Sequence, residues 1–137
     1  MRTLLLILSV SWAVLLQAEE LLVIASPKVP DTAISTKQLV DIYSSKKIHW
    51  ENDINVVPVN RESTSTERKK FSEAVFNLSP QALGEYWNRQ KFQGKRPPVI
   101  QNSDQAVVNF VRSIPGSIGY ISAKQSPAGV KVLLRLP

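Results

Sequence analysis

Apolar residues along the chain gather into short continuous runs that predict strands. "LLVIAS" at 21–26 is a continuous apolar run ended by Pro27, which is typical of a buried strand. "INVVPV" at 54–59 predicts a second strand, and its Pro58 predicts that the far end lies at an edge or outside the ladder. Further strands are predicted at 99–100, 118–122 and 130–136.

Four helices are predicted between these strands, and hydroxyl residues stand where they begin. Ser35 with Gln38 forms a capping box, Ser79-Pro80 gives a cap followed by an N1 proline, and Ser103 caps the last helix. Apolar positions at helical spacing predict the inner faces: Leu39, Ile42, Tyr43, Phe71, Ala74, Val75, Leu78, Leu83, Tyr86, Trp87, Val107, Val108, Phe110 and Val111.

The order of elements is therefore β-α-β-α-α-β-α-β-β. Strands that alternate with helices predict an α/β fold, a mixed sheet of about five strands with helices packed on it. No linker, repeat or low-complexity tract interrupts the chain. We expect one domain over residues 19–137.

The first 18 residues have the pattern of a secretory signal peptide. Arg2 precedes an apolar run from Leu4 to Leu16, and Ala18 stands at the expected cleavage point. The run is shorter than the roughly 20 residues of a spanning helix. An uncleaved amphipathic anchor is the alternative. We expect cleavage of residues 1–18, export to the periplasm through the general pathway, and no membrane span afterwards.

Charge and cysteine content narrow the function classes further. The chain carries a net charge of +6 and has no cysteine, so it is not a disulfide scaffold and depends on packing for stability. A basic exported protein favours small anions, acidic envelope polymers or lipid headgroups. Nucleic acid is not expected as a partner in that compartment.

The inventory of reactive residues argues against an enzyme. His49 is the only histidine, and no serine stands in a Gly-x-Ser-x-Gly elbow. A lone loop histidine is more often a surface or packing residue than a catalytic base. With no second histidine and no cysteine, a metal site has no support, and no cofactor is expected.

Four successive hydroxyl residues, Ser63 to Thr66, follow Arg61 and precede a helix, and two interpretations fit them. Thr64 and Glu67 match a capping box, which describes an ordinary helix start. Alternatively, hydroxyl donors from Ser63, Thr64, Ser65 and Thr66, with the guanidinium of Arg61, could complete an oxyanion site at the helix N-terminus. Neither Arg61 nor Ser65 is expected in the core.

A second basic cluster, Lys91, Lys95 and Arg96, surrounds Gly94 in a predicted loop. A solvated loop is the simpler interpretation of these charges. Trp50 and Trp87 are expected to pack in the core or at its rim.

Three stretches, taken in order, resemble one known family. "LVDIYSSKKIHWEND" resembles the "L-x-x-I-F-x-G-x-I-x-x-W-x-D" segment of phosphate-binding proteins of ABC transporters. "INVVPVNRESTSTERKKF" resembles the strand, arginine and Ser-Gly-Thr helix start that follow in that family. "VVNFVRSIPGSIGYIS" resembles the family's helix, Pro-Gly turn and strand. The chain is thus similar to the phosphate ABC transporter substrate-binding protein family, of the class II periplasmic binding protein superfamily.

The resemblance implies one lobe of a periplasmic binding protein-like fold. It places Arg61 and Ser65 on the family's arginine and serine, whereas Thr66 and Glu67 replace its glycine and threonine. It implies weak binding of phosphate or a similar small oxyanion, with an ABC transporter or another envelope protein as partner. The alternative is an envelope protein-interaction module that keeps the fold without the ligand.

Overall fold

The structure, a computed structural model, describes residues 20–137, so the predicted signal peptide lies outside the described residues. The predicted order of elements is confirmed. The strands are β1 (Leu21–Ala25), β2 (Val57–Arg61), β3 (Val99–Gln101), β4 (Ser117–Ser122) and β5 (Lys131–Leu136). The helices are α1 (Thr36–Tyr43), α2 (Thr66–Phe71), the π-helix η1 (Ser72–Phe76), α3 (Pro80–Lys91) and α4 (Asp104–Ser113).

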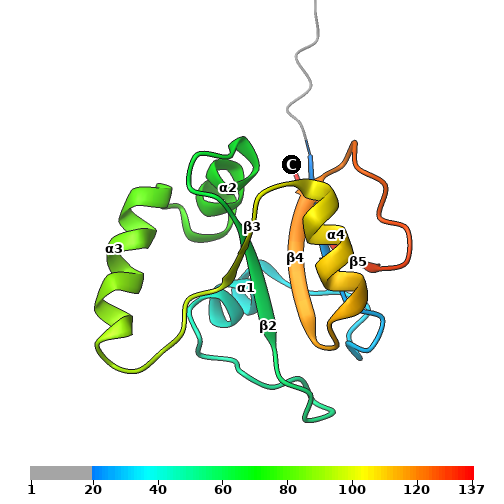
Figure 1. Cartoon of the computed structure of the whole chain (residues 1–137), viewed down its shortest axis with the longest axis horizontal. Helices are drawn as coiled ribbons and strands as arrows, with labels where there is room; N and C mark the ends of the chain where they lie inside the picture. The colour runs from blue at the N-terminus through cyan, green and yellow to red at the C-terminus, as the bar shows by residue number, and fades with distance from the viewer. Residues whose placement is uncertain (1–19) are drawn as a thin grey trace, which may run out of the picture.

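The strands form one mixed sheet in the order β3-β2-β4-β1-β5. β2 runs parallel to both β3 and β4, while β1 runs antiparallel to β4 and β5. In Figure 1, α4 lies over one face of the sheet and α3 stands away from the strands. The predicted α/β fold with a mixed five-stranded sheet is confirmed.

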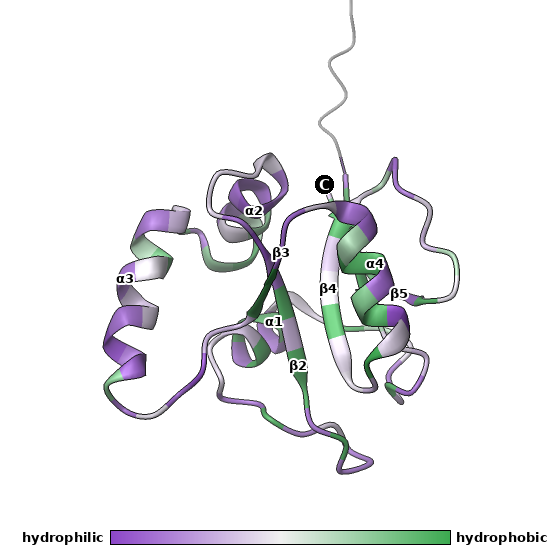
Figure 2. Ribbon diagram, in the orientation of Figure 1, coloured by the Kyte–Doolittle hydropathy of each residue, from purple (hydrophilic) through white to green (hydrophobic). Residues whose placement is uncertain are grey.

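Both faces of the sheet are covered, which explains why β1 is apolar at every position. Side chains alternate along a strand, so Leu21, Val23 and Ala25 join one core cluster while Leu22 and Ile24 join the other. The first cluster is closed by α1, α2 and η1, and the second by α4. Figure 2 shows hydrophobic positions on β2, β3, β4 and α4, while α3 is mostly hydrophilic.

Three aromatic rings pack together in the first cluster, against β2 and β4. The ring of Phe71 stacks on Tyr120 with a centroid distance of 4.0 Å and also contacts Tyr43 at 4.8 Å. The Tyr43 hydroxyl donates to the carbonyl of Val59 at 2.7 Å, so the buried phenol has a partner. Burial raises the pKa of Tyr43 and of Tyr120, and both hydroxyls stay neutral donors.

The second helical region departs from the sequence prediction. The i, i+3, i+4, i+7 spacing predicted Phe71, Ala74, Val75 and Leu78 on one buried face, but Ala74 and Leu78 are exposed. A wider π-turn over η1 changes the angular position of each later residue, and Asn77 ends it in the left-handed conformation at φ 53°. Phe71 and Val75 keep their predicted burial.

β2 also begins later than predicted, at Val57 rather than residue 54, and it is an interior strand. The Val57 amide donates to the Gly116 carbonyl beside β4. The nitrogen of Pro58 therefore faces β3, whose pairing with β2 starts only at Val59. Pro58 is tolerated because it precedes that ladder, although the expectation of an edge position was wrong.

The loop between α1 and β2 is fixed by Trp50 and Gly116. The indole Nε1 of Trp50 donates to the Gly116 carbonyl at 2.9 Å, and the ring is buried as predicted. Gly116 has φ 81°, and a Cβ atom there would lie 2.1 Å from the Asn55 carbonyl oxygen. Only glycine fits, so the loop and β4 are held in register by this contact.

Candidate functional site

The carboxyl ends of β2, β3 and β4 lie at one edge of the sheet, where α2 and α4 begin. β2 ends at Arg61, β3 at Gln101 and β4 at Ser122. In open α/β sheets, the crevice beyond the carboxyl ends of the strands is the usual ligand position. The residues that gather at this edge therefore form the candidate site.

Arg61 lies at the centre of this edge, and its side chain is only 9% exposed. The Nε and Nη2 atoms donate to the two carboxylate oxygens of Glu62, each at 3.0 Å. On the other side, Nη1 donates to Oδ1 of Asp104 and lies 3.7 Å from Oε2 of Glu67. The guanidinium is thus surrounded by three carboxylates.

Two of these carboxylates hold Arg61 in different ways. Asp104, at the start of α4, also accepts a hydrogen bond from the Ser122 amide through Oδ2 at 3.2 Å, so it ties Arg61 to β4. Glu62 lies at the outer side, with 32% of its side chain exposed. The hydrogen bond to Glu62 raises the pKa of Arg61, and the same bond holds the pKa of Glu62 below its ordinary value.

The backbone behind Arg61 is fixed by a buried polar network. The Arg61 amide donates to Oδ1 of Asn60 at 3.0 Å and to the Tyr120 hydroxyl oxygen at 3.3 Å. The Tyr120 hydroxyl donates to the same oxygen of Asn60. Sequence reasoning missed Asn60, Glu62 and Asp104 as parts of this site. Asp104 could have been noticed in the sequence as an acid in the first turn of a helix. Its proximity to Arg61 can be known only from the fold.

Ser65, not Thr64, caps α2. Its side-chain oxygen accepts from the Arg68 amide at 2.9 Å, so the predicted capping box of Thr64 and Glu67 is wrong. Glu67 turns instead toward Arg61. Ser65 and Arg61 are both buried, contrary to expectation, whereas Ser63, Thr64 and Thr66 are exposed. The structure therefore brings Arg61 and Ser65 to the sheet edge and leaves three hydroxyls in solvent.

Arg68 adds a second guanidinium behind the first. Its Nη1 donates to the Arg61 carbonyl at 2.9 Å, and its Nε is buried without a hydrogen-bond partner. Two arginines and three carboxylates thus share the edge, and the acids outnumber the bases by one. This balance weakens the attraction of a free anion to the site.

Other chemistry has little support in the part of the chain that the structure describes. His49 is exposed and pairs through its backbone with Asn55. Within residues 20–137, no three His, Cys, Asp or Glu side chains are grouped so that they could hold a metal ion. Among the same residues, none of the helices is both long and apolar enough to cross a membrane.

Solved structures with the same fold are substrate-binding proteins for phosphate. A phosphate ABC transporter substrate-binding protein with bound phosphate from Clostridium perfringens aligns with TM-score 0.69 and 23% identity, over 84% of this chain and 44% of its own. An ABC-type phosphate transport receptor from Vibrio cholerae aligns with TM-score 0.66 and 19% identity, over 84% and 45%. PstS from Borrelia burgdorferi aligns with the same score and identity, over 84% and 46%.

The chain spans less than half the length of these structures, which corresponds to a single lobe. No protein-family profile matches the sequence, and no curated protein matches it by sequence. At these identities the similarity establishes the fold. The resemblance predicted from three sequence stretches is confirmed at that level.

Proposed function

We propose that the protein is an exported, solute-binding-like domain that binds phosphate or a similar small oxyanion weakly through Arg61. The proposal rests on one observation: the two sides of the Arg61 guanidinium are bound to different degrees. Asp104 fixes Nη1 from the α4 side, while only the partly exposed Glu62 occupies the Nε and Nη2 pair. An oxyanion can accept from that pair with the same two-bond geometry as a carboxylate.

Glu62 is then a built-in competitor for the ligand. Its carboxylate accepts the two hydrogen bonds that a phosphate or sulfate would accept. A partly exposed ion pair contributes little net free energy, so an anion can displace Glu62 from Arg61 with little loss of stability. The Ser65 hydroxyl, which accepts from the Arg68 amide, still has a proton to donate. Ser63, Thr64 and Thr66 are exposed donors in the same turn.

The expected affinity is low. Glu67 and Asp104 repel an incoming anion, and the described chain contributes one lobe without a facing one. A few charge-assisted hydrogen bonds at an open edge correspond to a dissociation constant of roughly 0.1–1 mM, or about 4–5.5 kcal/mol. The phosphate-bound relative supports the choice of ligand.

The test is calorimetric titration with phosphate and sulfate at fixed ionic strength. Glu62→Gln should strengthen binding about five-fold, equivalent to ~1 kcal/mol, because the competing carboxylate is removed. Glu67→Thr should also strengthen binding by removing like charge. Glu85→Gln, an exposed acid on α3, is the matched control and should leave binding unchanged. Absence of binding at about 10 mM in both wild type and Glu62→Gln would refute the proposal.

A second candidate is an envelope protein-interaction module without a ligand. It is favoured by the complete pairing of the Arg61 side chain with carboxylates of its own chain. Failure of the titration above would make this candidate the leading one. An ABC transporter is a partner class for the first candidate, by analogy with the solved relatives.

Export completes the proposal, with residues 1–18 as signal peptide and 19–137 as the periplasmic domain. It rests on the Arg2, Leu4–Leu16 and Ala18 pattern of the sequence. Mass spectrometry of the protein recovered from the periplasm should give a chain that begins at Glu19. An intact Met1 on membrane-bound protein would contradict it.

A further inference from the structure

Phe92 is the most exposed large apolar side chain among residues 20–137, with 93% of its surface in solvent. It stands at the end of α3, immediately after Lys91. A single exposed apolar residue is common on protein surfaces and needs no explanation by itself. The surroundings of Phe92 make it different.

The turn that carries Phe92 is ordered by backbone hydrogen bonds. The amides of Gln93 and Lys95 both donate to the carbonyl of Gln90, and the Gly94 amide donates to that of Lys91. Gly94 has φ 76°, a left-handed conformation that favours glycine and closes the turn. The ring of Phe92 is thus held outward by a defined turn.

Four cations stand close to Phe92 along the chain, and no acid stands among them. Arg89, Lys91, Lys95 and Arg96 lie within seven residues of one another along the chain, and no Asp or Glu occurs between Glu85 and Asp104. Lys91, Lys95 and Arg96 form no ion pair within the described residues. Four unpaired or exposed cations within four residues of Phe92 along the chain give this segment a strong positive potential.

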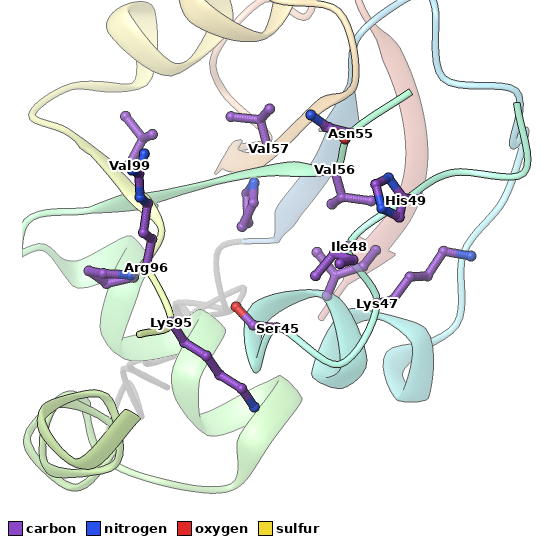
Figure 3. Close-up of a pocket in the computed structure, with 13 residues that line it drawn as sticks. Ser45, Lys47, Ile48, His49, Asn55, Val56, Val57, Lys95, Arg96 and Val99 are labelled. Carbon is purple, nitrogen blue, oxygen red and sulfur yellow. The ribbon is translucent and has the colours of Figure 1, made fainter. Parts of the chain in front are cut away.

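Lys95 and Arg96, which follow this turn, also line an open pocket of about 640 Å³. Lys95, Arg96 and Val99 line one side, and Lys47 and Ile48 line the other, as the sticks in Figure 3 show. Ile48 is 56% exposed. No Asp or Glu is among the lining residues. We call this surface, made of Lys47, Ile48, Lys91, Phe92, Lys95, Arg96 and Val99, the basic apolar face.

We propose that the basic apolar face docks on an anionic lipid surface. Phe92 enters the boundary between headgroups and acyl chains, and the cations contact lipid phosphates. Each Lys or Arg near an anionic bilayer raises the affinity about five-fold, and Phe side chains beside Lys and Arg enter the boundary between headgroups and acyl chains in interfacial segments. A fluid bilayer accommodates one ring that projects from a convex turn, whereas a folded protein partner needs a complementary pocket for it.

The proposed lipid contact is separate from the oxyanion site. The pocket is lined by Asn55, Val56, Val57 and Pro58, where β2 begins, whereas Arg61 lies where β2 ends. Lipid phosphate and free phosphate can therefore be distinguished by competition. The docking proposal does not depend on whether Arg61 binds an anion.

The experiment is co-sedimentation with vesicles, using residues 19–137, which contain all the described elements and both core clusters. Residues 1–18 are omitted because their apolar run would itself bind lipid. Vesicles of phosphatidylcholine alone are compared with vesicles that contain roughly 30% phosphatidylglycerol, an anionic lipid. Binding is expected only to the anionic vesicles, and it should weaken as salt is raised.

Replacement of Lys91, Lys95 and Arg96 together by Gln should weaken binding by roughly two orders of magnitude. The matched control replaces Lys28, Lys69 and Lys124 by Gln, which removes the same charge from exposed positions elsewhere. The control variant should lose much less affinity for the anionic vesicles. Equal loss in the two triple variants would show attraction by net charge alone and would overturn the proposal.

Phe92 has its own tests. Phe92→Ala should weaken binding at least about five-fold, and in Phe92→Trp the additional indole emission should shift to shorter wavelength on anionic vesicles only. Unchanged binding in Phe92→Ala, or absence of the shift, would overturn insertion of the ring.

Phosphate at about 10 mM and constant ionic strength should not compete with the vesicles, and competition would assign the binding to Arg61 instead. Binding to polyglutamate beads with none to the vesicles would indicate an acidic protein partner and would also overturn the proposal.

Discussion

Ser65 and Thr64 are neighbours in the chain, yet their hydroxyls have different roles. Ser65 caps α2 through the Arg68 amide, whereas Thr64 is exposed. Ser65→Ala should therefore lower the free energy of unfolding by about 1 kcal/mol. Thr64→Ala should stay within about 0.5 kcal/mol of wild type. Urea denaturation of the two variants measures the difference, and a larger loss in Thr64→Ala would contradict the assignment of the cap.

The ion pair of Glu62 with Arg61 should give stability a dependence on pH. The pKa of Glu62 is lowered in the folded state by its hydrogen bonds to Arg61. The contribution is therefore complete above the ordinary glutamate pKa of about 4.3 and is lost as pH falls through the lower folded value. Because Glu62 is partly exposed, Glu62→Gln should cost less than about 1 kcal/mol at neutral pH.

Thermal melts from neutral to acidic pH test this dependence. The gap in melting temperature between wild type and Glu62→Gln should narrow and close as the carboxylate becomes protonated. Glu85→Gln, which removes an exposed acid of α3, provides the reference for the loss of charge alone. A gap that widens on acidification would exclude the assigned ion pair.

At the residue scale, the sequence indicated Arg61 and Ser65 but not their neighbours in space. Both stand in a local pattern, an arginine before a helix start, which can be recognised without the fold. Asp104 lies 43 positions from Arg61 and meets it because β3, which precedes α4, pairs with β2 so that Gln101 lies opposite Arg61. The choice of Ser65 over Thr64 as cap depends on backbone angles that a row of four hydroxyls does not specify.

Among the elements, α2 and α4 contribute unequally to the core through their phenylalanines. Phe71 is buried between Tyr43 and Tyr120, so Phe71→Ala should cost roughly 3–5 kcal/mol. Phe110 was predicted in the core, but it is half-buried at the margin of the second cluster. We expect Phe110→Ala to cost about 1–2 kcal/mol, because folding removes less apolar surface of Phe110 than of Phe71 from water. Equal costs in chemical denaturation would contradict these placements.

The helices show where periodicity succeeds and where it fails. In α1, Leu39, Ile42 and Tyr43 are buried as the 3.6-residue period predicts. After Phe71 the same period fails, because η1 has a wider turn and moves Ala74 and Leu78 to the surface. A π-helix leaves no composition signal in this stretch, so the exposed positions could not be read from the sequence.

For the whole molecule, the fold was predictable because β1 has an unusual pattern. A continuous apolar run indicates a strand covered on both faces, and β1 indeed contributes to both core clusters. The order of strands in the sheet was not predictable, since β1 pairs with β4 and β5, which lie about a hundred residues away. These pairings depend on packing across the sheet rather than on local pattern.

Because β1 contributes to both core clusters, we expect the protein to unfold in one cooperative transition. Helix α3 is the exception, since it should open separately. Leu83 and Trp87 are buried but belong to neither cluster, and Figure 1 shows α3 away from the sheet. The main polar contact of α3 with the rest of the described chain is the Tyr86 hydroxyl, which donates to the Ser44 carbonyl at 3.2 Å. α3 should therefore open locally at a lower free energy than the core.

Native-state hydrogen exchange measures this opening directly. Amides of β1 and β4 should exchange only through global unfolding, whereas those of α3 should exchange earlier and with little dependence on denaturant. α4 is the control helix, because it is of similar length and packs Val107, Val108 and Val111 into the second cluster. Equal protection in α3 and α4 would mean that Leu83 and Trp87 join α3 to the core as firmly as these valines join α4.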